Sequence, residues 1–122
     1  MVIGGGPAGL EAARSAAELG GEAILIEKRE RLGGTPDREN YAKLTHHWRD
    51  ASEAMAEMAN AVTSNKNVEV KYSAEVKGIS GSAGNFTVEI EAGGAAESLN
   101  VGAVIIATGF QRCNTTTNEG GT

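Results

Sequence analysis

Apolar residues near the N-terminus gather in two short runs, residues 1–3 and residues 23–26, and the second run ends at Glu27. Between the runs a glycine-rich turn leads into an alanine-rich segment that closes at Gly20 and Gly21. Alanine favours helix, and a glycine pair supplies the left-handed residue that ends one. Near-continuous apolar runs are typical of strands buried on both faces of a parallel sheet. The pattern predicts a strand–helix–strand unit over residues 1–27.

A helical period dominates the middle of the chain. Between residues 41 and 62 apolar side chains recur at steps of three and four, which predicts an amphipathic helix with one buried face. Its start is open, because Asn40 and Thr45 are both suitable N-cap residues. The polar stretch 64–67 ends it. Before this helix, a glycine pair and a proline within residues 32–36 predict a loop without regular structure.

From residue 68 onward, apolar and polar residues alternate with a period of two. Residues 68–72 read as a strand, and residues 76–101 as a small antiparallel meander with one face open to water. The continuous apolar run 104–107 predicts a buried strand that returns to the first sheet. We therefore expect an α/β, Rossmann-like three-layer fold with a central parallel sheet and a small antiparallel β-meander. The polar residues 114–122 are expected to form a disordered tail.

Composition narrows the functional classes. The chain has 122 residues, 40% of them hydrophobic and 22% charged, which suits one globular domain. Its net charge is −5 and its basic residues form no stripe, so we expect no nucleic-acid partner. Cys113 is the single cysteine, which excludes an internal disulfide and a cluster held by this chain's cysteines alone. With no membrane-length apolar run and no secretory leader pattern, the expected location is cytoplasmic.

The glycine-rich turn after the first predicted strand accounts for some of the chain's seventeen glycines. Gly4, Gly6 and Gly9 follow the first strand and open the helix, and Glu27 ends the second strand, 18 residues after Gly9. In a dinucleotide-binding turn these glycines allow the tight turn, the approach of a diphosphate and close helix–strand packing. The acid then accepts hydrogen bonds from the adenosine ribose and disfavours a 2′-phosphate. The alternative is a glycine-rich turn beside a surface glutamate.

Three segments, GGGPAGLEAA, EKRERLGG and VIIATGF, indicate which dinucleotide the site binds. They resemble the two-dinucleotide-binding-domain flavoproteins of the pyridine nucleotide-disulfide oxidoreductase superfamily, along about residues 2–110. The resemblance implies a fold that binds FAD and NAD(P), with FAD as the cofactor of this segment. It places the second glycine pair toward the flavin and the backbone near Val76 toward adenine. Together, motif and resemblance give the expected FAD-binding residues: Gly4, Gly5, Gly6, Pro7, Ala8, Gly9, Glu27, Lys28, Gly33, Gly34, Thr35, Val76, Ala107, Thr108 and Gly109. For Lys28, a solvated lysine at a strand end remains an equal alternative.

The chain also departs from this superfamily. The disulfide reductases carry a redox-active cysteine pair after the second glycine pair, whereas this chain reads GGTPDRENYAKL there. Within the superfamily the chain looks most like the A-type subunit of heterodisulfide reductase and the quinone-interacting oxidoreductase flavoprotein subunits. Dienoyl-CoA reductase and glutamate synthase small-subunit relatives fit the first segment equally well. The resemblance implies a flavin that relays electrons from a nicotinamide or other donor to an iron–sulfur or quinone-linked acceptor, with partner subunits that carry the clusters.

Other residues invite functional readings that the sequence does not favour. His46 and His47 are neighbours in the predicted helix and point about 100° apart, so they do not form a metal-ligand pair. Met55 and Met58 lie on its apolar face and are expected in the core. Cys113 is expected to be an unpaired thiol without a role. No residue is assigned as catalytic or metal-binding.

The domain organisation follows from these expectations. We expect residues 1–113 to form one incomplete FAD-binding domain within an N-terminal fragment, followed by the tail 114–122. The leading hypothesis is the FAD-binding part of an oxidoreductase. The alternative is a non-catalytic module that binds a dinucleotide, FAD or NAD, without turnover.

Overall fold

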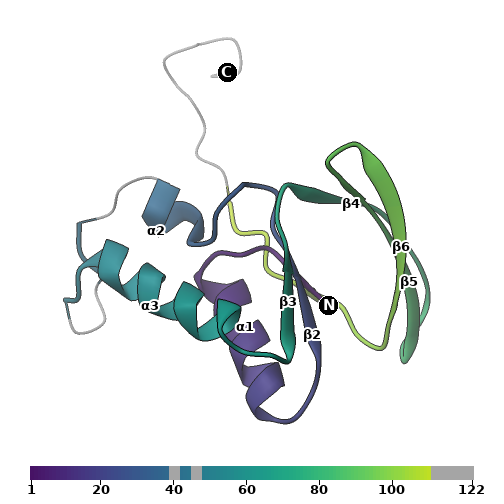
Figure 1. Ribbon diagram of the computed structural model, residues 1–122, viewed down its shortest axis with the longest axis horizontal. Coiled ribbons are helices and arrows are strands. Elements are labelled where there is room, and N and C mark those ends of the chain that lie inside the picture. Colours follow the sequence, from purple (N-terminus) through teal and green to yellow (C-terminus); the bar gives the residue numbers. More distant parts are fainter. Residues whose placement is uncertain (39–41, 45–47, 111–122) are drawn as a thin grey trace.

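The computed structural model describes residues 1–38, 42–44 and 48–110. Four strands form a parallel sheet in the order β3-β2-β1-β7, and three strands form an antiparallel sheet in the order β4-β5-β6 (Figure 1). The elements are β1 (Val2–Ile3), α1 (Pro7–Glu18), β2 (Ala23–Ile26), α2 (Gly34–Arg38), α3 (Ala51–Thr63), β3 (Val68–Lys71), β4 (Ala74–Ser82), β5 (Asn85–Ala92), β6 (Ala95–Val101) and β7 (Ile105–Ile106). This is the α/β, Rossmann-like arrangement predicted from the sequence.

The fold has three layers because side chains of β2 alternate between two apolar clusters. Leu25 packs with Leu10 of α1 and Val62 of α3 on the helical side of the parallel sheet. Ile26 faces the other way and packs with Val88 and Ile90 of the meander. Figure 1 shows α1 and α3 on one side of β2 and β3, and the meander on the other. The prediction that the apolar run 23–26 forms a strand buried on both faces is confirmed.

The long helix begins later than predicted. Helix α3 starts at Ala51, so the predicted start near residue 41 was wrong. Lys43 and Asp50 instead pair across an isolated antiparallel bridge, with 2.5 Å between the lysine Nζ and the carboxylate Oδ1. Trp48 has a φ of 50°, which an α-helix cannot accommodate, and its side chain is 70% exposed. The three-and-four spacing therefore extended by chance beyond the true helix.

The predicted loop at residues 32–36 is in part a helix. Helix α2 covers Gly34–Arg38, and Pro36 lies in its first turn. A proline is tolerated there because the first N–H groups of a helix have no intrahelical partner. The prediction of a loop without regular structure was therefore wrong over this helix.

The last strand is shorter and less buried than predicted. Strand β7 covers Ile105–Ile106, at the edge of the parallel sheet beside β1. The Ile105 side chain is 45% exposed and the Ile106 side chain 72% exposed, so the prediction of a buried strand was wrong for the described chain. The return to the first sheet is confirmed, since β7 pairs with β1 in parallel.

Several predictions fall on residues outside the described ranges. These are the two N-cap candidates Asn40 and Thr45, the histidine pair His46 and His47, the thiol of Cys113 and the tail 114–122. Within the described ranges, no helix has both the length and the apolar character that crossing a bilayer requires.

Candidate functional site

The site lies where the parallel strands end. Gly4, Glu27 and Ala107 directly follow β1, β2 and β7, so they meet at one edge of the sheet. The Gly4 N–H donates to the Ile26 carbonyl at 2.8 Å, and the Ala107 N–H donates to the Ile3 carbonyl at 2.8 Å. Ligands of open α/β sheets bind at this edge, outside the carboxyl ends of the strands.

Two glycines of the first turn are required by packing. A Cβ on Gly9 would stand 1.6 Å from the Gly4 carbonyl oxygen, and a Cβ on Gly4 would stand 2.2 Å from the Ala107 carbonyl oxygen. Gly4 also has a φ of 113°, which side chains rarely adopt. Gly9 therefore lets α1 and β1 approach, the role that the sequence motif predicts for the third glycine.

Gly6 is different, because packing does not require a glycine there. Its backbone is extended, with φ −82° and ψ −170°, and a Cβ would meet only the Gly34 Cα, at 3.4 Å. Gly6 lies on the wall of a pocket, so its missing side chain leaves room in the pocket. A glycine at a position where the protein itself leaves room for a side chain indicates that a ligand approaches the backbone closely there.

Gly6 also occupies the N-cap position of α1. Among the described residues no side chain caps this end of the helix, and Pro7 follows as the first helical residue. The Leu10 N–H donates to the Gly6 carbonyl at 2.9 Å, which begins the helical hydrogen-bond series. Because the first N–H groups of a helix lack intrahelical partners and carry partial positive charge, this end favours an anion such as a phosphate.

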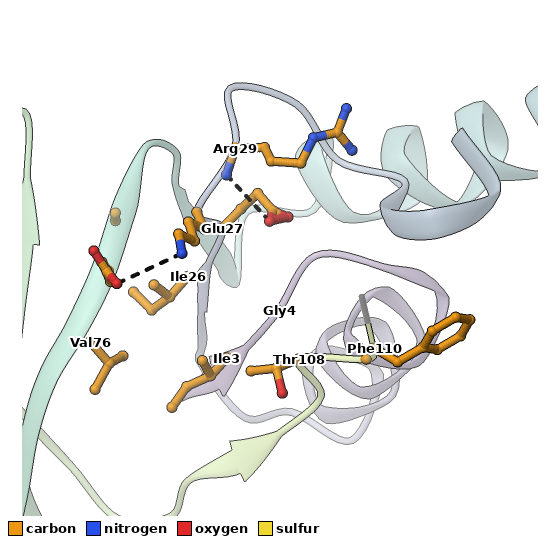
Figure 2. Close-up of a pocket in the computed structure, with 12 residues that line it drawn as sticks. Ile3, Gly4, Ile26, Glu27, Arg29, Val76, Thr108 and Phe110 are labelled. Carbon is orange, nitrogen blue, oxygen red and sulfur yellow. Dashed lines mark hydrogen bonds and ion pairs between the residues drawn. The ribbon is translucent and has the colours of Figure 1, made fainter. Parts of the chain in front are cut away.

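The carboxylate predicted to hold a ribose is buried beside the turn. Glu27 is 7% exposed, and its Oε1 accepts a long hydrogen bond of 3.5 Å from the Arg29 N–H. A Cβ on Gly5 would stand 2.9 Å from the Glu27 Oε2. Gly5 thus leaves space for the carboxylate. Figure 2 shows Glu27 and Arg29 on one side of the Gly4 turn, and Thr108 and Phe110 on the other.

The second glycine pair packs directly on the first turn. The Gly33 N–H donates to the Gly5 carbonyl at 2.8 Å. Gly34 has a φ of 61°, and a Cβ there would stand 2.6 Å from the Gly6 Cα. The two glycine motifs, 24 or more residues apart in the chain, therefore form one wall.

Two adjoining pockets occupy this edge of the sheet. The larger, of about 510 Å³, reaches from the Gly4 turn to Val76 of β4, and the smaller, of about 180 Å³, lies against the first turn of α1 and Gly34. Glu27 and Arg29 belong to both. The larger volume alone is in the range of small-molecule sites. Every predicted site residue except Gly9 and Gly33 lines one of the two pockets.

Lys28 lies at the rim of the larger pocket. Its side chain is 78% exposed, and its Nζ lies 3.8 Å from the Glu75 Oε1. The sequence left two alternatives for Lys28, a cofactor-binding residue and a solvated lysine at a strand end. Its position agrees with part of each, because the side chain is solvated and also lines the pocket.

Sequence reasoning missed several lining residues. Arg29, Ala74, Glu75 and Phe110 all contribute to the larger pocket. Arg29 and Phe110 each lie next to or two positions from a recognised motif residue, which is a usable signal. Ala74 and Glu75 likewise lie within two positions of the predicted Val76, and the hydrogen bond from the Ala74 N–H to the Glu27 carbonyl, at 3.0 Å, holds them beside the site. Among the described residues, no group of three or more His, Cys, Asp or Glu side chains is arranged to hold a metal.

The comparison with protein families decides the affiliation of the chain. The model of the pyridine nucleotide-disulphide oxidoreductase family matches residues 1–121. The chain belongs to this family. Proteins of the family bind FAD, as the sequence motifs led us to expect.

Curated relatives of this family member include heterodisulfide reductase subunits. The chain is 38% identical over 92 residues to an A-type iron-sulfur subunit of the CoB–CoM heterodisulfide reductase of Methanopyrus kandleri, covering 75% of this chain and 14% of that protein. It is 37% identical over 92 residues to the A-type subunit of the H(2):CoB-CoM heterodisulfide,ferredoxin reductase of Methanothermobacter marburgensis, again covering 75% and 14%. The similarity to heterodisulfide reductase expected from the sequence is confirmed. The chain spans only about a seventh of these relatives.

Solved structures agree on the fold. L-proline dehydrogenase from P. horikoshii superimposes with a TM-score of 0.80 at 26% identity, covering 88% of this chain and 22% of that one. Thioredoxin reductase from Lactococcus lactis superimposes with a TM-score of 0.75 at 26% identity, covering 93% and 36%. Both are oxidoreductases, as expected of this family.

Proposed function

We propose that residues 1–113 form an FAD-binding domain and that the edge of its parallel sheet holds the ADP half of FAD. One observation carries the proposal. The buried Glu27 lies beside the N-terminal end of α1, which no side chain of the described residues caps; both line the smaller pocket, and Glu27 also lines the larger one. An acid for the ribose and a helix end for the diphosphate are the two parts that an adenine dinucleotide requires.

The residues present fit such a cofactor. Gly6 and Ala8, at the start of α1, would face the diphosphate, and Glu27 would accept hydrogen bonds from the ribose hydroxyls. Val76, in the larger pocket, would lie on the adenine side. Gly34, against the first turn, would lie on the flavin side. The supporting observation is the space at Gly6, which protein atoms leave open to 3.4 Å.

We further propose that the chain serves an oxidoreductase in which the flavin relays electrons from a nicotinamide or other donor to an iron–sulfur or quinone-linked acceptor. FAD supplies the electron-transfer chemistry when bound. The described residues bind and orient it. The names of the relatives support a complex that contains iron–sulfur clusters, because the similar proteins are themselves iron-sulfur subunits of heterodisulfide reductases. A cytoplasmic location stays a prediction, consistent with a single cysteine.

The proposal is tested by titrating the purified chain with ADP, FAD, FMN, NAD and NADP in a calorimeter. We expect binding of ADP and FAD, competition between the two, and no binding of FMN, which lacks the ADP half. NADP should bind more weakly than NAD, because the Glu27 carboxylate repels a 2′-phosphate. Bound FAD should show an absorption band at about 450 nm that bleaches on reduction.

Two results would change the conclusion. Failure to bind any of the five ligands would overturn the assignment of the site. Equal affinity for FAD and NAD, with no reduction of bound FAD by any donor, would favour the alternative of a dinucleotide-binding module without turnover.

A further inference from the structure

Helix α2 carries part of the second glycine pair, and it is too short to hold that pair in place by itself. It has five residues, Gly34–Arg38. Helices of this length are not stable in isolation, because few backbone hydrogen bonds offset the ordering of the chain. Yet the Gly33 N–H donates to the Gly5 carbonyl at 2.8 Å. Gly34 packs so closely on the first turn that a Cβ there would stand 2.6 Å from the Gly6 Cα. Contacts of its side chains must therefore fix α2.

Asp37 connects α2 to the loop that precedes it. Its side chain is 15% exposed, and its Oδ1 accepts a hydrogen bond of 2.7 Å from the Arg31 Nη2. Its Oδ2 lies 4.0 Å from the Arg29 Nη2, at the limit of an ion pair. Figure 2 shows the Arg29 side chain running away from the Gly4 turn. Two cations of the loop thus lie beside one carboxylate of the helix.

The same side chain packs against the second glycine pair. A Cβ on Gly33 would stand 2.6 Å from the Asp37 Cβ, so the missing side chain of Gly33 leaves the space that Asp37 occupies. Asp37 lines neither pocket of the proposed site, whereas Gly34 lines the smaller one. Asp37 therefore acts on the site through the glycine pair.

The burial of the Asp37 carboxylate makes its pairing matter. A fully exposed ion pair contributes little to stability, because water screens both charges. A carboxylate that is largely withdrawn from water depends on its partner, since the lost hydration is otherwise not replaced. Without this contact α2 would leave the first turn in a fraction of the molecules. A ligand that requires α2 in place would then bind more weakly in proportion to that fraction.

We propose that Asp37 is a positioning residue that holds the second glycine pair against the first turn and so completes the flavin side of the cofactor site. The inference rests on the proposed function, in which Gly34 lies on the flavin side. The ADP half, held at Gly6 and Glu27, does not require α2. Loss of the Asp37 carboxylate should therefore lower FAD affinity and spare ADP affinity.

The first test needs no cofactor. Hydrogen exchange in the purified 122-residue chain, followed by NMR, compares the Gly33 amide with the Ala107 amide, which donates to the Ile3 carbonyl at 2.8 Å. Asp37→Ala keeps the Cβ that packs against Gly33 and removes the carboxylate. The Gly33 amide should then exchange about 3- to 10-fold faster, and the Ala107 amide at its original rate.

The second test is calorimetric titration with ADP and FAD. Asp37→Ala should lose FAD affinity by about 3- to 10-fold and keep its ADP affinity. Arg31→Met changes an exposed side chain and should have the same effect. The double variant should lose no more than either single variant, because both changes break one contact.

Glu57→Ala is the matched control. The Glu57 Oε2 lies 2.6 Å from the Arg49 Nη2, and neither residue lines a pocket of the proposed site. This variant also loses an ion-paired carboxylate, yet it should bind ADP and FAD like the unaltered chain. Its Gly33 amide should exchange at the unaltered rate.

An unchanged Gly33 exchange rate in Asp37→Ala would overturn the inference and leave the proposed function intact, as would unchanged FAD affinity. Equal losses of ADP and FAD affinity would likewise overturn it, because the effect would not be confined to the flavin side. If the unaltered chain binds neither ligand, the proposed function fails and the flavin-side role fails with it, while the exchange rates still decide whether Asp37 holds the glycine pair.

Discussion

Replacing Gly6 with alanine should separate folding from cofactor binding. The Gly6 backbone, at φ −82° and ψ −170°, is open to any residue, and an added Cβ would meet only the Gly34 Cα at 3.4 Å. Gly→Ala at a compatible position stabilises a protein by about 0.4–1 kcal/mol through the unfolded chain. Alanine is a poorer N-cap than glycine, by an amount on the order of 0.5–1 kcal/mol. The two terms nearly cancel.

The expected effect on binding is much larger. The new methyl group would project into the smaller pocket at the start of α1 and keep a diphosphate away from the helix N–H groups. Hydrogen bonds to a charged group contribute about 1.5–3 kcal/mol each. Losing two of them would weaken ADP and FAD binding by at least about 100-fold. The melting midpoint should shift by less than about 5 °C, because the folding terms offset each other.

Circular dichroism melts and calorimetric titration with ADP measure the two effects on the same sample. Gly9→Ala is the contrasting variant, because its Cβ would stand 1.6 Å from the Gly4 carbonyl oxygen. Relief of that overlap requires α1 to move from β1, at a cost on the order of 3 kcal/mol or more. Gly9→Ala should therefore lower the midpoint strongly. Unaltered ADP affinity in Gly6→Ala would refute the placement of the diphosphate.

Two other outcomes follow from the same structure. Glu27→Gln should weaken ADP binding by about tenfold and reduce the difference in affinity between NAD and NADP, because it removes a buried charge but keeps a hydrogen-bond acceptor for the ribose. If titrations show the same difference in affinity as in the unaltered chain, Glu27 does not contact the ribose. Leu25→Ala should cost about 2–5 kcal/mol in urea unfolding, whereas Ile106→Ser should cost under about 0.5 kcal/mol, because Leu25 is 0% and Ile106 72% exposed. An equal loss of unfolding free energy in the two variants would show that β7 is buried.

Local patterns of the sequence determined the elements whose neighbours are also local. The unit 1–27 was predicted from apolar runs and helix-forming residues, and the alternation in 76–101 predicted the meander. The glycine spacing at 4–9 and the acid at 27 predicted the pocket wall, because steric demands at a turn select glycine directly. The family was also evident from the sequence, since its motifs are short and contiguous.

Tertiary structure decided what depends on distant neighbours. Helix α3 begins at Ala51 because a bridge to Lys43 holds Asp50 outside the helix, and spacing alone does not encode that bridge. The apolar run of β7 was expected to be buried, yet burial depends on which elements cover a strand and not on its own residues.

The candidate site shows the same division. Gly33 and Gly34 were recognised as a motif, but their hydrogen bond and contact with the first turn arise only when the chain folds back. Asp37 looks like one charge in a polar stretch until its packing against Gly33 and its pairing with Arg31 become visible. A sequence records which groups are present, whereas their desolvation and pairing are properties of the packed structure.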